Sequence, residues 1–314
     1  MNPLTGLYGA GIALRNTLFD HRVLASALLQ RPVVSVGNLS AGGTGKTPFV
    51  IALGELLKER GRRFDILSRG YGRKTRGVRV VDPKGSASEF GDEPLLLARR
   101  LGVPVVVGES RYDAGRTAEQ RFDSELHILD DGFQHRSLAR DFDIVLIAPG
   151  DLQDRLLPSG RLREPFSSLN RADAIVMPQD VASEKSVPAG KSTWRMTREI
   201  SLSGVCPSPV VFCGLGRPDQ FFAQVRSAGV TPAAEIVFRD HHAYDMDDVQ
   251  ALLGARRELG AGGFLTTEKD AINLGPLQAR LEHLAVATLK LTIDRSAELV
   301  NTILTRIADR KPRS

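Results

Sequence analysis

A glycine-rich loop between an apolar segment and a helical segment constrains this chain more than any other feature. Residues 32–37 are largely apolar, and the chain continues as Asn38-Leu39-Ser40-Ala41-Gly42-Gly43-Thr44-Gly45-Lys46-Thr47. In such a P-loop the backbone N–H groups surround phosphates, the lysine reaches the β- and γ-phosphates, and the threonine hydroxyl ligates Mg²⁺. The strict pattern has glycine where Ser40 stands, but the strand, loop and helix context outweighs this departure. We therefore expect residues 40–47 to bind a nucleotide.

A second apolar segment supplies the acidic partner that a P-loop requires for its metal. Leu126-His127-Ile128-Leu129 is followed directly by Asp130 and Asp131. Because parallel strands end at the same edge of a sheet, one of these carboxylates is expected near the magnesium ion. The alternative is an aspartate that only caps the next turn. A GTPase is not favoured, because Lys269 and Asp270 are adjacent in Thr267-Glu268-Lys269-Asp270, where a guanine-binding motif has one residue between lysine and aspartate.

Short apolar segments alternate with amphipathic helical patterns along the first half of the chain. Strands are expected at residues 32–37, 64–68, 103–107, 125–129, 142–147 and 174–177, with helices such as 47–60 and 93–101 between them. This order is typical of a parallel sheet that is covered on both faces. Right-handed crossovers then give a doubly wound α/β fold.

The length of 314 residues corresponds to about two domains. We expect a P-loop domain over residues 1–188, an extended linker over 189–204 and a smaller α/β domain over 205–314. In the smaller domain, strands are expected at 210–213, 234–238, 264–266 and 284–288, and helices at 218–227, 246–259 and 296–308. The pattern lapses at residues 178–192, which we interpret as a boundary region, and residues 310–314 are expected to fray.

Charge and cysteine content narrow the possible partners. The two cysteines, Cys206 and Cys213, form no disulfide framework, which favours a reducing compartment. Residues 58–79 carry nine Lys/Arg against two acidic side chains within a net charge of +5. Such a stretch suits an anionic partner, or it is a solvated face. Nucleic acid is not favoured, because aromatic residues make up only 6% and no aromatic-rich basic motif occurs.

The N-terminal residues form an amphipathic pattern. No stretch reaches the ~18 apolar residues of a transmembrane helix, and no basic segment precedes the apolar part, as a signal peptide would require. Residues 4–19 predict a helix with apolar positions at Leu4, Leu7, Tyr8, Gly11, Ile12 and Leu18/Phe19. This helix can lie in a membrane interface or pack on its own domain.

A kinase also needs a group that takes the proton from the accepting hydroxyl. Candidates are Asp92 and Glu93 in Gly91-Asp92-Glu93-Pro94, His135, and the pair His241 and His242. Taken alone, each of these residues is more often a helix cap, a turn residue or a surface group.

An ordered set of motifs resembles one family, the tetraacyldisaccharide 4′-kinases of lipid A biosynthesis. Besides the P-loop and the segment Asp130-Asp131-Gly132-Phe133-Gln134-His135, the set contains Ser68-Arg69-Gly70-Tyr71-Gly72, Gly91-Asp92-Glu93-Pro94, Leu162-Arg163-Glu164-Pro165, Phe212-Cys213-Gly214-Leu215-Gly216-Arg217-Pro218, Asp240-His241-His242-Ala243-Tyr244 and Thr267-Glu268-Lys269-Asp270. A P-loop alone is generic, whereas the ordered set is specific and covers most of the chain.

The resemblance implies an activity and a location. It implies ATP- and Mg²⁺-dependent phosphorylation of the 4′-hydroxyl of a tetraacylated glucosamine disaccharide 1-phosphate, which gives lipid IVA. It implies a peripheral enzyme on the cytoplasmic face of the inner membrane, with no obligate protein partner. It also implies two α/β/α domains joined by a short two-stranded linker, with the site between them. A substrate with four acyl chains then favours an interfacial N-terminal helix beside the basic residues 58–79.

The resemblance also implies roles for individual residues. Asp92 takes the proton from the sugar hydroxyl, with His241 of the other domain as its partner, and Lys46 serves the phosphates. Thr47, Glu93, Asp130 and Asp131 belong to the magnesium and ATP site. The expected substrate contacts are Arg69, Arg111, His135, Arg163 and Glu164. The alternative from a different class is a P-loop regulatory or assembly ATPase without a lipid substrate, which the P-loop and Asp130 fit equally well.

Overall fold

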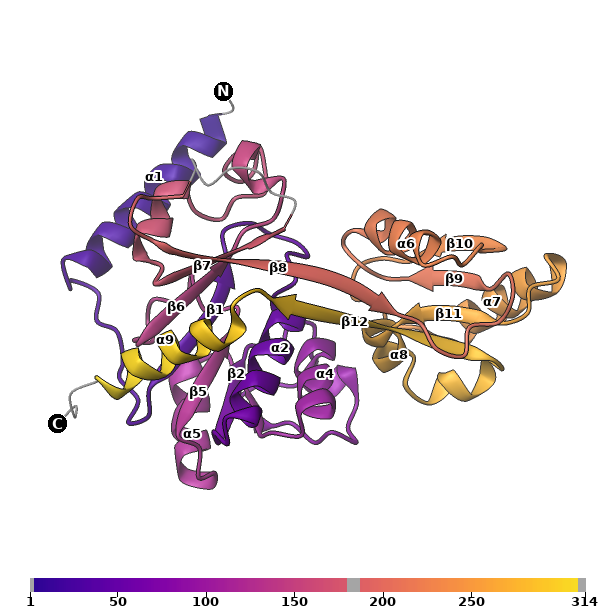
Figure 1. The fold of residues 1–314 in the computed structure, drawn as a ribbon, viewed down its shortest axis with the longest axis horizontal. Coiled ribbons are helices and arrows are strands. Elements are labelled where there is room, and N and C mark those ends of the chain that lie inside the picture. The colour runs from indigo at the N-terminus through magenta and orange to yellow at the C-terminus, as the bar shows by residue number, and fades with distance from the viewer. Residues whose placement is uncertain (1–2, 180–186, 310–314) are drawn as a thin grey trace.

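The computed structural model describes residues 3–179 and 187–309, and within this part twelve strands form one continuous sheet (Figure 1). The strand order is β10-β9-β11-β12-β8-β7-β6-β1-β5-β2-β4-β3. The α/β fold class predicted from the alternating pattern is therefore confirmed. Residues 180–186, which are part of the expected boundary region, and the expected frayed tail at 310–314 lie outside the described residues.

The first unit is a doubly wound parallel sheet. Its parallel strands are β1 (Val33–Asn38), β2 (Phe64–Ser68), β4 (Val105–Val107), β5 (Leu126–Asp130), β6 (Phe142–Leu146) and β7 (Ala174–Pro178), and β3 (Arg79–Val80) is antiparallel to β4. Helices α2 (Lys46–Glu59) and α4 (Asp92–Leu101) share one apolar core with the sheet, and α5 (Arg111–Arg121) covers the other face. The short segments α3 (Ala87–Phe90), η1 (Asp151–Gln153) and η2 (Phe166–Arg171) complete this unit.

Two long strands connect this unit to the second one. The first half of β8 (Ser192–Ser201) pairs with β7, and its second half pairs antiparallel with the second half of β12 (Leu284–Ile293). The first half of β12 pairs with β11. Figure 1 shows these two strands running side by side from one unit to the other.

The second unit is smaller and is also covered on both faces. Strands β9 (Val210–Cys213), β10 (Ala234–Val237) and β11 (Phe264–Thr267) are parallel. Helix α6 (Pro218–Ser227) packs on one face, and α7 (Met246–Glu258) with η4 (Gly275–Arg280) packs on the other. Helix α8 (Glu268–Leu274) begins directly after β11 and faces the first unit, where it contacts α4.

The last helix, α9 (Ser296–Ala308), differs from expectation. The predicted domain over residues 205–314 would include it, but α9 lies against the first unit (Figure 1). Its residues Leu299, Val300 and Ile303 are buried in the core that α2 and α4 share. The reason is the length of β12, which has ten residues instead of the five expected and carries the chain back to the first unit. The other domain boundaries stay a prediction.

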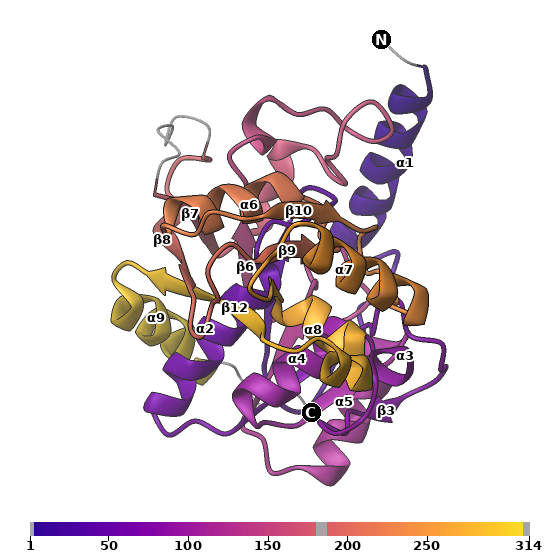
Figure 2. The same cartoon turned by 90° about the vertical axis from the view of Figure 1, so that its right-hand side faces the viewer.

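Helix α1 (Pro3–Asp20) lies on the outside of the first unit and contains no buried residue (Figure 2). Its apolar positions do not form the single face that was expected, because Leu4, Leu7 and Leu14 are 59–73% exposed while Tyr8 and Ile12 are turned toward the protein. None of the helices in the described residues is both long enough and apolar enough to cross a membrane.

The basic residues 58–79 do not form one patch. Strand β2 separates those that precede it from those that follow it, so the two groups lie at opposite ends of that strand. Arg63 pairs with Asp123 at 3.2 Å, and Arg73 pairs with Glu109 at 2.7 Å. These pairs weaken the expectation that this stretch supports α1 at an anionic surface.

Candidate functional site

A cleft of about 1010 Å³ lies between the two units, at the C-terminal edge of the parallel sheet. The first unit contributes the P-loop, the end of β5 and the start of α4. The second unit contributes the loop before α6, the residues around His241 and the start of α8, and Arg198 and Ile200 come from β8. This is the edge at which open α/β sheets bind ligands.

The glycine-rich loop passes into α2 through a left-handed glycine. Gly45 has φ 88° at the N-terminus of α2, so the helix can begin with Lys46 immediately after the loop. Nζ of Lys46 donates to Oδ1 of Asn38 at 3.1 Å and lies 3.4 Å from Oδ1 of Asp131. At Gly42 nothing stands within 4 Å of where a Cβ would be, which leaves the backbone open to a phosphate.

Ser40 is the member of the predicted loop that does not line the cleft. Residues 41–47 form part of the wall, whereas Ser40 is fully buried behind it in a bridge with Leu162. Asn38 Nδ2 donates to its carbonyl at 2.6 Å. The departure from glycine at Ser40 is tolerated because this position pairs with a neighbouring segment instead of approaching the ligand.

Asp130 and Asp131 end β5 in two different electrostatic environments. Burial, together with the nearby carboxylates Glu93 and Asp131, raises the pKa of Asp130 to about 7. Burial opposes the ionisation of Asp131 as well, but Lys46 and Arg163 outweigh it and hold the pKa of this carboxyl below its usual value. Three carboxylates close enough to repel one another indicate a place for a cation.

The donor set at this edge fits a magnesium–nucleotide complex. The Thr47 hydroxyl and the Asp130 and Glu93 carboxylates are hard oxygen ligands. Among the described residues, no group of three or more His, Cys, Asp or Glu side chains is arranged to hold a metal by itself. Magnesium usually binds through one or two carboxylates and completes its shell with phosphate oxygens and water, so the arrangement suits it.

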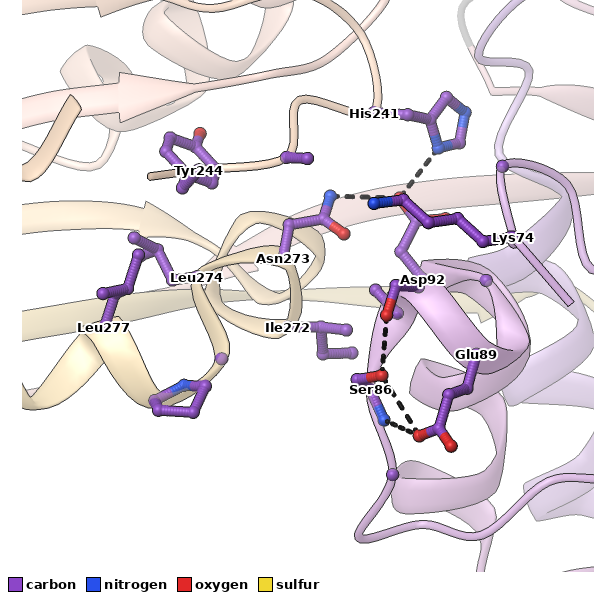
Figure 3. A pocket seen from close by; sticks show the side chains of 18 of the residues that line it. Lys74, Ser86, Glu89, Asp92, His241, Tyr244, Ile272, Asn273, Leu274 and Leu277 are labelled. Atoms are coloured by element: carbon purple, nitrogen blue, oxygen red, sulfur yellow. Dashed lines mark hydrogen bonds and ion pairs between the residues drawn. The ribbon is translucent and has the colours of Figure 1, made fainter. Parts of the chain in front are cut away.

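Asp92 and His241 come together across the two units (Figure 3). Nδ1 of His241 lies 2.7 Å from Oδ2 of Asp92, and Asn273 of α8 donates to the same oxygen at 3.3 Å. The backbone N–H of Glu93 donates to Oδ1 of Asp92 at 2.8 Å. His241 has φ 56°, a left-handed conformation that is uncommon outside glycine and is often found at functional positions.

The hydrogen bond between Asp92 and His241 favours an ionised carboxylate and a protonated imidazole, and the neighbouring charge of Lys269 favours the ionised carboxylate as well. Burial opposes ionisation of Asp92, but the His241 hydrogen bond and the Lys269 charge outweigh it and lower the pKa of the carboxyl. The same hydrogen bond raises the pKa of His241 against the effect of burial. The pair lies between two hollows, because His241 lines both the main cleft and an adjoining pocket of about 850 Å³ whose wall includes Asp92.

The predicted substrate residues divide into two groups. Arg69, Arg111, His135 and Arg163 all line the cleft. Burial and the charges of Arg111 and Arg140 lower the pKa of His135 to about 4, so its imidazole is neutral. Nε of Arg111 is buried, and within the described residues it has no hydrogen-bond partner. An arginine in this position is available to an anion.

Glu164 is placed differently. It is fully buried, and it is not among the described residues that line the cleft. Its carboxylate accepts hydrogen bonds from Asn16 and Arg171, both at 2.9 Å. The expectation that it contacts a substrate is therefore not supported by its position.

Sequence reasoning missed several residues of the cleft and of the adjoining pocket. Lys269 pairs with Glu93 at 3.0 Å, Asn273 holds Asp92, and Arg198 donates to the carbonyl of Thr44. Lys269 stood in a quoted motif, but it was examined only as part of a guanine-binding sequence. Asn273 and Arg198 carry no motif that would have drawn attention to them.

The chain is similar to known proteins both in sequence and in overall fold. The model of the family described as Tetraacyldisaccharide-1-P 4′-kinase matches residues 1–308. The tetraacyldisaccharide 4′-kinase of Koribacter versatilis (strain Ellin345) is 46% identical over 321 aligned residues and 99% of each chain. The enzyme of the same name from Aquifex aeolicus (strain VF5) is 40% identical over 96% of each chain. A crystal structure of the "apo" form of LpxK from Aquifex aeolicus in complex with ATP superposes with a TM-score of 0.81 at 37% identity, over 97% of this chain and 98% of that one.

Proposed function

The chain belongs to the family of tetraacyldisaccharide-1-P 4′-kinases, and on this premise we propose that it transfers the γ-phosphoryl group of ATP to the 4′-hydroxyl of a tetraacylated glucosamine disaccharide 1-phosphate. One observation carries the proposal: a carboxylate and an imidazole from two different units meet at 2.7 Å beside a P-loop cleft. A kinase uses a positioned carboxylate of this kind to take the proton of its accepting hydroxyl, whereas an ATPase without such an acceptor does not need one.

The residues that line the two ends of the cleft indicate how ATP would lie in it. Its phosphates would meet the P-loop, and its base would lie at the apolar end, where Ile200, Leu215, Phe221 and Leu289 line the wall. The amides of Gln220 and Gln224 at that end can donate and accept hydrogen bonds with a purine. Support for ATP also comes from the Aquifex aeolicus LpxK structure, which is described as a complex with ATP.

Thr47, Asp130 and Glu93 would hold Mg²⁺ against the phosphates. When bound, the ion supplies charge neutralisation on the β- and γ-phosphate oxygens. Lys46 adds a fixed positive charge at the same phosphates. Asp131 keeps that lysine in place, because it lies 3.4 Å from Nζ.

The chemical step asks mainly for position and charge. Asp92 is ionised at neutral pH and accepts the proton of the sugar hydroxyl as the sugar oxygen bonds to the γ-phosphorus. The bond between that phosphorus and the β-phosphate oxygen breaks in the same step, and ADP is the leaving group. His241 keeps the carboxylate oriented through the 2.7 Å contact with Oδ2. Arg111 and Arg163 lie on the side of the cleft that holds Asp131 and can neutralise the transferred group or the phosphate of the acceptor. Contact between the two units excludes water from the reacting phosphate.

A tetraacylated acceptor lies in a bilayer, so the enzyme has to reach a membrane surface. The exposed leucines of α1 provide an apolar surface for this, since Leu4, Leu7 and Leu14 are 59–73% exposed. Leu28 and Val23, which follow α1, are also exposed, at 51% and 69%. We propose peripheral docking through this surface on the anionic cytoplasmic face of the inner membrane.

Phosphoryl transfer to the lipid tests the proposal directly. Purified protein, ATP and Mg²⁺ are mixed with detergent-dispersed tetraacyl disaccharide 1-phosphate, and the lipid is analysed by mass spectrometry. We expect one added phosphoryl group, and a loss of roughly 10²–10³ in kcat for Asp92→Asn. His242→Gln is the matched control, because its imidazole pairs with Asp248 within the second unit at 2.7 Å.

The same assay addresses the alternative of a regulatory or assembly ATPase. For a kinase, ATP consumption depends on the lipid acceptor. If ATP were consumed at the same rate with and without the acceptor and the lipid gained no phosphate, the kinase proposal would be wrong and the ATPase would take its place.

A further inference from the structure

Glu164 is a buried carboxylate that lines neither of the two pockets described above, although the preceding residue, Arg163, lines the cleft. Its side chain is fully buried. It accepts hydrogen bonds from Asn16 at 2.9 Å, from Arg15 at 3.4 Å and from Arg171 at 2.9 Å. A buried charge persists only where partners satisfy it, and here the partners come from two separate segments, α1 and the end of η2.

The residues just before Glu164 lie along the P-loop. The backbone N–H of Arg163 donates to the carbonyl of Leu39 at 2.7 Å, and that of Ala41 donates to the carbonyl of Arg161 at 2.7 Å. Ser40 and Leu162 form the antiparallel bridge between these two contacts. Residues 161–163 thus run antiparallel beside residues 39–41, at the start of the phosphate-binding loop.

The side chain and carbonyl of Arg163 extend this connection in both directions. Nη1 of Arg163 reaches Oδ2 of Asp131 at 3.0 Å, and Asp131 in turn lies 3.4 Å from Nζ of Lys46. The carbonyl of Arg163 accepts a hydrogen bond from the Tyr8 hydroxyl of α1 at 3.0 Å. An unbroken series of polar contacts therefore runs from α1 to the lysine that binds phosphate.

Arg171 connects the same carboxylate to the turn that follows Asp131. Its guanidinium stacks on the ring of Phe133 at 4.5 Å. Phe133 packs directly against Gly37 of β1, because a Cβ added at Gly37 would lie 2.5 Å from the Cβ of Phe133. A shift of Arg171 would therefore move Phe133 and, with it, the turn after Asp131.

We propose that Glu164 is a positioning residue that couples α1 to the phosphate-binding loop, so that docking of α1 on a lipid surface changes the affinity for ATP. The proposal rests on the proposed function for the idea that α1 meets a membrane. Helix α1 has no buried residue, so polar contacts such as those of Tyr8, Arg15 and Asn16 hold it on the protein. A helix attached in this way can change its position when its outer leucines enter a bilayer, and the contacts of Glu164 transmit that change.

Coupling of two binding events is reciprocal and can be measured without the lipid substrate. The dissociation constant of a fluorescent ATP analogue is determined with and without phosphatidylglycerol vesicles. For the wild type we expect vesicles to change this constant by about three- to tenfold, a coupling near the lower end of the usual range. For Glu164→Gln we expect no vesicle effect, although the protein still sediments with vesicles.

Two further variants make the result specific. Tyr8→Phe removes only the hydroxyl that donates to the Arg163 carbonyl, and it should reduce the vesicle effect while the fold is kept. Asp20→Asn also loosens α1, because Asp20 pairs with Arg136 at 2.7 Å, but this contact does not run through residues 161–164. Asp20→Asn should therefore keep the vesicle effect.

The readouts separate this role from a direct substrate contact. A positioning role predicts a lower kcat and weaker ATP binding for Glu164→Gln at an unchanged KM for the lipid, whereas a substrate contact predicts a raised KM for the lipid only. The proposal is overturned if vesicles bind the wild type without changing its ATP affinity, or if Glu164→Gln responds as the wild type does. If Glu164→Gln does not fold, an unchanged response in Tyr8→Phe overturns it. Each of these outcomes leaves the phosphoryl-transfer assay untouched, so a failure of the coupling is distinct from a failure of the kinase.

Discussion

Replacing Lys269 by methionine tests whether the second unit completes the site. Lys269 is the second residue of α8, and its side chain is only 19% exposed. Its Nζ lies 3.0 Å from Oε1 of Glu93 and 3.8 Å from Oδ2 of Asp92. Methionine keeps most of the length and apolar character of the side chain but removes the charge, so two carboxylates at the start of α4 lose their shared cation.

The size of the effect follows from these contacts. At an effective dielectric constant of about 20, a charge pair at this separation attracts by roughly 5 kcal/mol, and the cost of desolvating the buried ammonium offsets part of this. Hydrogen bonds to charged groups contribute about 1.5–3 kcal/mol net. If the bond is needed only when the units are in contact, its loss lowers kcat/KM by roughly 10- to 150-fold.

Steady-state kinetics with the lipid acceptor measures this loss. Lys269→Arg should restore part of the activity, since the guanidinium can reach the same carboxylates. Lys290→Met in β12 is the control, because Lys290 is exposed on the linker strand. A folded Lys269→Met enzyme with kcat/KM within twofold of the wild type would refute the reasoning.

Two further outcomes follow from the structure. Burial opposes protonation of His127, but hydrogen bonds to Asp65 and Glu119 outweigh it and raise the pKa to about 9 from 6.5. The raised pKa contributes to the free energy of unfolding by at most about 3 kcal/mol. This contribution is fully present below pH 6.5 and is lost as the pH rises through about 9. Urea unfolding across this pH range should show the loss, and His127→Asn should flatten it; equal slopes would contradict the assignment. The second outcome concerns α1, where three exposed leucines are replaced by serine. Each replacement removes about 1 kcal/mol of the free energy of membrane binding, so the affinity for vesicles should fall on the order of a hundredfold. The affinity for ATP without vesicles should stay unchanged. Vesicle sedimentation measures the fraction of protein that binds. If the variant bound as the wild type does, docking through Leu4, Leu7 and Leu14 would be excluded.

The fold was predictable because its signals are local. Each parallel strand of the first unit is a largely apolar and buried run of a few residues, and the P-loop marks where β1 passes into α2. The length of β12 was not predictable in this way. Its second half alternates between buried and half-exposed or exposed residues because it forms one strand of a two-stranded ribbon, and its partner β8 lies far away in the sequence. Helix α9 was consequently assigned to the wrong unit.

The site was predictable only in part, because two similar carboxylates have opposite surroundings. Asp92 and Glu164 both lie close to a proline in short acidic motifs, and the resemblance implied a catalytic role for Asp92 and a substrate contact for Glu164. His241 and Asn273, which hold Asp92 at the cleft, are 149 and 181 residues away in sequence. The partners that bury Glu164 include Asn16, which is 148 residues away. Neither set of partners is visible in the residues next to the carboxylate.

The contacts between α4 and the second unit explain how the site can both close and reopen. Arg100 pairs with Glu268 at 2.6 Å, Lys269 with Glu93, and His241 and Asn273 with Asp92. In each contact at least one side chain is partly exposed to water, so its net contribution does not exceed the roughly 1.5–3 kcal/mol of a hydrogen bond to a charged group. Together they favour contact between the units by only a few kcal/mol. A nucleotide that bridges the P-loop and the start of α8 can supply the additional free energy that keeps the two units in contact. When the nucleotide leaves after the transfer, this free energy is lost, the units separate and the product lipid can leave.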